Sequence, residues 1–387
     1  MKALLCAEIR KSWKSKRFLL SILGFLCFFG AVYVISLQKE KAYEDELIMQ
    51  LHYENPVASE RCLTLMHILQ ITAKEKETPH QKEEAYLWCD IQDATSSWTN
   101  MRQSPDYFDW HDTLRYAAQR PLLYRSLIEL ESSVDLLKEL GISKATLNTD
   151  HSYYQYFLDH DIQPYTSPYE PTLLNFLLQI FQQDTMLLLL LVVCMLVADQ
   201  ICHDYESGTY KLIYSMPISR RTLMIAKILS ASFVILVSFL AALALFSIPL
   251  LALHGLGSMQ YPYVIHSDTV VSWSWLMIRA VPVTLLVSIC YMSAAILLAS
   301  WQKTVSNTML CIGSILIILY FTMRIFDTSF FLFSWIPFFY LYPLDIAAQA
   351  YAADSITCTL ICLLWVPVLF AYTIHMINRS DLEGGMR

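Results

Sequence analysis

Residues 204–227 form a polar loop between two apolar stretches, and their types and order predict a short helix that can work as a lever. Asp204 can cap that helix, and Glu206 suits the positive first turn. The helix has an apolar side, formed by Leu212, Ile213 and Met216. We therefore expect an amphipathic element that a soluble partner can press and that passes the motion to the adjoining spans.

The second half of this loop predicts where the short helix ends. Pro217 cannot continue a helix, and Ser219 can cap the next one. Arg220, Arg221 and Lys227 would hold the start of the following span at the anionic inner surface of a membrane.

The sequence holds no pattern for nucleotide binding, metal binding or catalysis. It contains no G-x-x-x-x-G-K-[ST], C-x-x-C or H-E-x-x-H motif. The histidines near apolar stretches stand singly, without a carboxylate or nucleophile at a useful spacing; they are His203, His254, His266 and His375. We expect a chain that is no enzyme and binds no cofactor, so that energy for any transport comes from another polypeptide.

Composition excludes a soluble enzyme. The chain is 56% apolar and only 16% charged, and its apolar residues form runs, whereas soluble domains are about 45 to 50% apolar. Residues 38–175 carry a net charge of -11 and the remainder +4. Because neither part has a basic stripe, we exclude nucleic acid as a partner.

Six stretches are long and apolar enough to cross a hydrocarbon layer of about 30 Å, which predicts an all-α polytopic membrane protein with six transmembrane helices. We expect them at 18–37, 173–198, 223–253, 270–300, 305–323 and 355–377. The second stretch reaches this length only by including polar residues, which are Gln179, Gln182, Gln183 and Asp184.

Basic residues predict the orientation of these spans. Residues 1–17 carry six Lys and Arg and residues 199–227 carry four, whereas 254–269 carry none and 324–354 carry one. By the positive-inside rule, both termini face the cytoplasm. The cytoplasmic parts are then 1–17, 199–222 and the tail 378–387, and the extracellular parts are 38–172, 254–269 and 324–354.

The large extracellular segment 38–172 predicts a helical domain. Apolar residues recur at three- and four-residue spacing in Ser59–Lys74, Gln81–Met101 and Pro121–Leu140, and Gly141 follows at a C-cap position. The segment has two cysteines, Cys62 and Cys89. They could form a disulfide in an oxidising compartment or remain two buried thiols.

Residues 1–17 predict either an amphipathic interface helix or a basic flank that sets orientation. Leu5, Ile9 and Trp13 recur at four-residue steps, and the opposite side is basic. That side carries Arg10, Lys14 and Arg17.

Charged residues within spans cost about 2.5 to 3.5 kcal/mol and therefore call for a partner or an aqueous path. Asp184 and Arg279 are both expected in the outer parts of their spans, where they could pair or line a vestibule. Snorkelling to the headgroups explains Arg279 equally well. The candidate translocation path thus comprises Gln179, Gln182, Gln183, Asp184 and Arg279.

The aromatic segment 330–351 is interrupted by Pro337 and Pro343, which a full span would tolerate poorly. We interpret it as a re-entrant or interfacial hairpin on the outer side, or as a plain aromatic belt.

The 204–227 loop resembles the loop between spans two and three in the permease subunits of ABC-2 type transporters. The shared pattern is an acid, Ser-Gly-Thr, a Leu/Ile-rich turn, Pro-Ile-Ser and a basic pair. The matching residues are Glu206, Ser207, Gly208, Thr209, Lys211, Pro217, Ser219, Arg220 and Arg221. The resemblance implies that this segment is a coupling helix that docks on a separate ATPase subunit.

The resemblance further implies an exporter in which two permease subunits, as a homo- or heterodimer, assemble with two ATPases that bind ATP and Mg. The apolar spans favour an amphipathic or hydrophobic substrate, such as a peptide, an antimicrobial or a lipid-like compound. One alternative is sodium export by a permease of the same family. Another is a sensor or adaptor that binds a ligand through residues 38–172 without transport.

Overall fold

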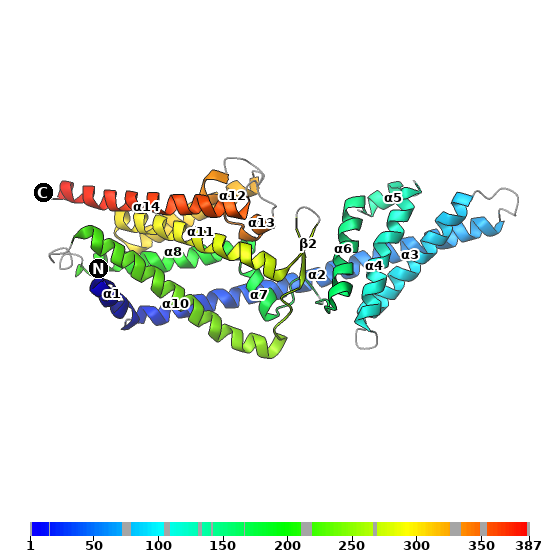
Figure 1. The fold of residues 1–387 in the computed structure, drawn as a ribbon, viewed down its shortest axis with the longest axis horizontal. Coiled ribbons are helices and arrows are strands. Elements are labelled where there is room, and N and C mark those ends of the chain that lie inside the picture. The colour runs from blue at the N-terminus through cyan, green and yellow to red at the C-terminus, as the bar shows by residue number, and fades with distance from the viewer. Residues whose placement is uncertain are drawn as a thin grey trace. The chain divides into compact units, whose positions relative to one another are not determined.

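The computed structural model divides the chain into two compact units (Figure 1). The membrane unit comprises Met1–Ser36, Pro171–Leu256 and Leu276–Arg387, and the inserted unit comprises Leu37–Glu170 and Gly257–Trp275. The structure describes residues 2–14, 16–71, 79–103, 109–130, 134–140, 142–165, 167–209, 219–265, 269–325, 334–348 and 354–384.

Among the described residues, six long helices are apolar enough to cross a membrane, which confirms the all-α polytopic fold. They are α2 (Lys16–Ile71), α8 (Gln183–Glu206), α10 (Arg220–His254), α11 (Trp273–Gln302), α12 (Val305–Ile325) and α14 (Ser355–Gly384). The stretches within them that are apolar enough to cross a membrane are Lys16–Glu46, Asp184–Glu206, Ile225–His254, Trp273–Gln302, Val305–Met323 and Ser355–His375. A separate helix, α1 (Lys2–Lys14), precedes them.

The first helix continues well beyond the predicted end of its span at residue 37. α2 runs without interruption to Ile71 and contributes to both units. Lys, Glu, Ala and Leu follow the apolar stretch and all favour a helix, but the frequent Lys and Glu make this part of the chain too polar for a membrane. Hydropathy therefore marks the end of the span but not the end of the helix.

The second predicted span, 173–198, differs in the structure, which breaks it into two helices. α7 (Leu173–Gln179) ends before α8 begins. At the break, the Thr185 hydroxyl lies within hydrogen-bond distance of three backbone carbonyls, those of Gln179 at 2.5 Å, Gln182 at 2.9 Å and Ile180 at 3.2 Å, and its one hydrogen can serve this cluster of acceptors. The apolar crossing consequently begins at Asp184 and ends at Glu206.

Aromatic side chains from several helices fill the core of the membrane unit. Phe29 is fully buried, and its ring lies 5.4 Å from Phe239 and 6.2 Å from Phe176. Ser21 and Ser238 share a buried hydrogen bond of 2.6 Å between α2 and α10. These contacts fix the first and third spans against each other.

The proline-broken segment forms two short helices that pack onto this core. They are η3 (Pro337–Phe339) and α13 (Pro343–Ala347). The Tyr291 hydroxyl donates to the Phe338 carbonyl at 2.6 Å, and the Trp365 ring nitrogen donates to the Trp335 carbonyl at 3.1 Å. The flanks 330–333 and 349–351 of the predicted hairpin lie outside the described residues.

The inserted unit is a helical bundle with one small hairpin. Besides the end of α2 it contains α3 (Pro79–Gln103), α4 (Trp110–Glu129), α5 (Val134–Glu139), α6 (Lys144–His160) and the antiparallel strands β1 (Pro262–Val264) and β2 (Val270–Ser272). Trp88, Tyr124 and Leu127 are buried at its centre. Cys62 of α2 and Cys89 of α3 form a disulfide.

The predicted helix Pro121–Leu140 differs in the structure, where it belongs to two helices. α4 begins earlier, at Trp110, because the Asp109 carboxylate accepts the His111 amide hydrogen at 3.1 Å and caps the helix. Pro121 lies inside α4, which ends at Glu129, and α5 follows separately. Gly141, the predicted C-cap residue, lies outside the described residues.

The β-hairpin is held to the bundle by aromatic rings. Tyr165 stacks on Tyr261 with centroids 3.9 Å apart, and Phe157 of α6 meets the Tyr261 ring edge-on at 5.2 Å. Burial raises the pKa of Tyr261, so its hydroxyl stays protonated at neutral pH. The segment predicted as a simple loop, 254–269, therefore contributes to the core of the inserted unit.

Removing the disulfide should destabilise the inserted unit. The bond closes a loop across a sequence separation of 27, so serine at both Cys62 and Cys89 should lower the free energy of unfolding by about 2 to 4 kcal/mol. Hydrogen exchange of α3 measures this loss. Chemical reduction of the unaltered chain should reproduce it, and Cys6→Ser, at an exposed free thiol, should not. Equal hydrogen-exchange protection of α3 in the unaltered, reduced and serine-substituted chains would contradict a structural role for the disulfide.

His111 should make the inserted unit sensitive to pH. Its two ring nitrogens lie 3.0 Å from Asp109 and 2.8 Å from Asp161, and these hydrogen bonds raise the pKa of His111 above 6.5. The contact of protonated His111 with Asp161 joins α4 to the end of α6. Its contribution to stability is fully present below the unfolded-state pKa of His111 and is lost as the pH rises through the higher folded-state pKa. The protection factors of the first turn of α4, which correct for the base-catalysed rise in intrinsic amide exchange, should fall across this range. His111→Gln should abolish the dependence, and an unchanged pH profile in that variant would refute this assignment.

Candidate functional site

The site that the sequence singled out begins at the end of α8. Glu206 is the last residue of α8 and Ser207 is its C-cap. After the loop, Ser219 caps α10, and its hydroxyl accepts the Thr222 amide hydrogen at 3.3 Å. Arg220 and Arg221 are the first two residues of α10, whereas Lys211 and Pro217 lie outside the described residues.

Ser207, Gly208 and Thr209 terminate α8. The Ser207 hydroxyl donates to the His203 carbonyl at 2.7 Å, and the Thr209 hydroxyl donates to the Asp204 carbonyl at 3.3 Å. Gly208 has φ +71°, a left-handed conformation that costs any other L-residue about 1 to 2 kcal/mol. The Ser-Gly-Thr signature is therefore a helix stop whose geometry requires glycine.

Glu206 joins the end of α8 to the start of α12. Its Oε1 accepts the backbone N–H of Val305, the first residue of α12, at 2.8 Å. A carboxylate at this position satisfies an open donor and complements the positive end of the helix dipole. The sequence predicted that Glu206 would serve the first turn of the following helix, and the structure instead places it in the last turn of α8.

Asp204 is the centre of an ionic cluster that joins α1, α8 and α10. Its side chain is 6% exposed and contacts the ammonium of Lys227 through Oδ2 and that of Lys11, at 3.1 Å, through Oδ1. Because a buried carboxylate is costly without ionic partners, this arrangement needs both elements in place. The sequence predicted that Lys227 would lie at the anionic membrane surface, and in the structure its ammonium binds Asp204. It also predicted that Asp204 would cap a later helix, and Asp204 instead lies within α8.

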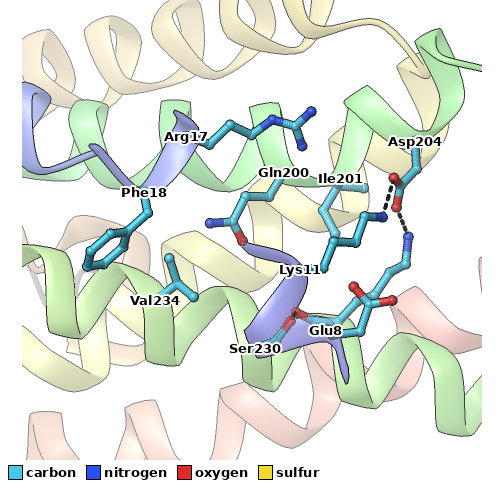
Figure 2. A pocket seen from close by; sticks show the side chains of 10 residues that line it. Glu8, Lys11, Arg17, Phe18, Gln200, Ile201, Asp204, Ser230 and Val234 are labelled. Atoms are coloured by element: carbon cyan, nitrogen blue, oxygen red, sulfur yellow. Dashed lines mark hydrogen bonds and ion pairs between the residues drawn. The ribbon is translucent and has the colours of Figure 1, made fainter. Parts of the chain in front are cut away.

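A cavity of about 100 Å³ adjoins the cluster (Figure 2). It lies between α1, the start of α2, the end of α8 and the start of α10. At its rim, the Arg17 Nε lies 3.8 Å from an Asp199 carboxylate oxygen. The lining residues are Glu8, Lys11, Arg17, Phe18, Gln200, Ile201, Asp204, Lys227, Ser230 and Val234.

The residues of the candidate translocation path contact different helices. Gln179 is buried and accepts a hydrogen bond from the Ser36 hydroxyl. Asp184 accepts from the Tyr320 hydroxyl at 3.4 Å, and the Arg279 guanidinium lies 3.8 Å from the Asp354 carboxylate. Gln182 is the N-cap of α8, and Gln183 is its first residue.

Sequence reasoning missed the part played by Lys11 and the pairing of Asp204. Lys11 lies 193 positions from Asp204, so no local pattern connects them. One signal was available, because an acid beside the apolar residues Ile201 and Cys202 at the end of a span calls for a cation.

A comparison with protein families identifies the chain. A family model described as ABC-2 family transporter protein matches residues 3–382. The chain belongs to this family. It is a transmembrane permease component of ABC transporters, a multi-pass membrane protein of a class that is not itself catalytic. No curated protein and no solved structure matches the chain.

The Asp204 cluster should stabilise this ABC-2 permease. Asp204→Asn strands Lys227, whose side chain is 12% exposed, and should cost about 3 kcal/mol, lowering the midpoint of thermal unfolding in detergent. Adding Lys227→Met should recover much of the loss, because the cation that then remains, Lys11, is 52% exposed and can be solvated. Asp199→Asn is the control, since its carboxylate is 35% exposed and its removal should cost under about 1 kcal/mol. Equal effects of Asp204→Asn and Asp199→Asn would contradict the role of the cluster.

Proposed function

We propose that the chain is the permease subunit of an ATP-driven exporter and that a separate ATPase subunit, which binds ATP and Mg, acts on the segment after α8. The observation that supports this most directly is the anchoring of the end of α8. Asp204 links it to α1 and α10, and Glu206 links it to α12. A force that the ATPase exerts on the segment 210–218 would therefore be transmitted through the end of α8 to α1, α10 and α12 at the same time.

The proposed mechanism is a switch of the membrane unit between inward- and outward-facing states. Closure of the ATPase pair would displace the segment 210–218, which follows the helix stop at Gly208. A second permease subunit, identical or related, would complete the path. The family membership supports both kinds of partner.

The proposed orientation places both termini in the cytoplasm and most of the inserted unit outside. The count of Lys and Arg in the connecting segments supports it. The Cys62–Cys89 disulfide supports it independently, because such bonds persist in oxidising compartments outside the cytoplasm. The inserted unit would then cap the exit or receive the cargo.

We propose that the substrate is amphipathic or hydrophobic, for instance a peptide, an antimicrobial or a lipid-like compound. The six candidate spans are strongly apolar, and described charges such as Asp184 and Arg279 have polar partners of their own. A small hydrophilic cargo would instead need a polar lining with donors and acceptors left open.

Gly208→Ala should uncouple ATP hydrolysis from transport. No atom would touch the added methyl group, so the change acts through the backbone, which would leave φ +71° and misdirect the 210–218 segment. A penalty of 1 to 2 kcal/mol corresponds to about a tenfold loss of transport. The measurement is substrate uptake into inverted lipid vesicles, with ATP turnover followed in parallel.

Gly24→Ala is the matched control for that substitution, because its methyl group also meets open space but its backbone is helical. The ATPase should copurify with both variants. Full transport by Gly208→Ala would overturn the coupling role of this residue, and failure of any ATPase to copurify with the unaltered chain would favour a sensor or adaptor.

A further inference from the structure

The cavity beside Asp204 lies at the level where membrane-spanning helices meet the headgroup layer. The candidate span of α2 begins at Lys16, that of α8 ends at Glu206 and that of α10 begins at Ile225. The cavity is lined by residues from these same helix ends and from α1. It is therefore placed where the polar end of a phospholipid would be found.

Several polar side chains in the cavity have donors or acceptors to spare. Among the described residues, neither Glu8 nor Gln200 has a hydrogen-bond or ion-pair partner, and the Arg17 Nε lies 3.8 Å from Asp199, which is beyond hydrogen-bond distance. Lys11 uses one contact, to Asp204, and remains 52% exposed. Figure 2 shows Arg17 and Glu8 on different sides of the cavity, with Gln200 and Lys11 between them.

These spare groups match a ligand that carries both charges. Arg17 and Lys11 offer N–H donors suited to a phosphate, and the Glu8 carboxylate offers acceptors suited to an ammonium. The lining has three cations and two acids, and Asp199 beside Arg17 supplies a third acid, so the whole site is close to neutral. A net-neutral zwitterion fits this balance better than an anion.

Apolar and aromatic side chains complete the fit for a lipid. Phe18, Ile201 and Val234 line the cavity, and Phe18 stacks on Trp13 with ring centroids 4.7 Å apart. Aromatic rings of this kind favour the membrane interface. A cavity needs about 10 to 15 Å³ of this volume to hold one water, so about 100 Å³ has room for both the phosphate and the ammonium of one headgroup, while the acyl chains would extend outward from it.

We propose that this cavity binds the headgroup of a phospholipid with a primary ammonium, with its phosphate at Arg17 and Lys11 and its ammonium at Glu8. The bound phosphate adds a second anion for Lys11 beside Asp204. Occupancy thereby strengthens the attachment of α1 to α8 and α10. The composition of the membrane would then tune how firmly the end of α8 is held.

Native mass spectrometry of the full-length chain, delipidated in detergent, tests the proposal. The probes are phosphatidylethanolamine, phosphatidylcholine and phosphatidylglycerol with identical acyl chains, and inorganic phosphate. We expect phosphatidylethanolamine to bind most tightly and to raise the thermal unfolding midpoint. Inorganic phosphate should not displace it. Tighter binding of phosphatidylglycerol, equal binding of phosphatidylcholine, or displacement by inorganic phosphate would overturn the proposal.

Two substitutions test separately which residue binds the phosphate of the headgroup and which binds its ammonium. Arg17→Gln should weaken binding of phosphatidylethanolamine about tenfold through loss of a charged hydrogen bond. Glu8→Gln should remove the preference for phosphatidylethanolamine over phosphatidylcholine. The control is Arg10→Gln, an exposed cation of α1 outside the cavity, which should change neither.

Equal binding by Arg17→Gln and Arg10→Gln would refute the phosphate assignment, and a preserved preference in Glu8→Gln would refute the ammonium assignment. Should Arg17→Gln fail to fold, Glu8→Gln still decides the proposal. The measurement needs neither ATPase nor transport, so its outcome is independent of the exporter function.

Discussion

A carboxylate removed from water organises the end of the permease that carries the family signature. Asp204 lies at the edge of an apolar bundle, where a lone negative charge would be too costly to retain. It persists because Lys11 and Lys227 approach it from two other helices. The helix stop at Ser207 to Thr209 follows directly, and Thr209 also donates to this carboxylate. The end of α8, where the signature begins, is thus held by an electrostatic contact that lies outside the signature itself.

Hydropathy predicted the fold because crossing a membrane imposes a long, local and repetitive requirement on the sequence. That requirement alone predicts six spans, and the described part of the chain has six helices long and apolar enough to cross a membrane, the second of them beginning at Asp184 instead of residue 173. Features set by single polar groups could not be predicted in this way. The break between α7 and α8 has the Thr185 hydroxyl beside its backbone carbonyls, and the extension of α2 runs through a polar stretch with high helix propensity.

The candidate site was only partly predictable. Gly208 and the acid before it are recognisable in sequence because they are contiguous, and the structure gives glycine a conformational reason. The partners of the site are distant, since Val305 lies 99 positions from Glu206 and Lys227 lies 23 from Asp204. A single sequence shows which groups need a partner but does not show which residue supplies it.

The aromatic attachment of the β-hairpin also limits how far the protein can be treated as a set of interchangeable modules. Tyr261 is 4% exposed, and Phe157 and Tyr165, from the other segment of the inserted unit, cover its ring. A shortened chain lacking 38–170 would present this hairpin with its apolar side uncovered, a surface prone to self-association. Gain or loss of the long insertion in evolution would therefore require matched changes in the short connection between α10 and α11.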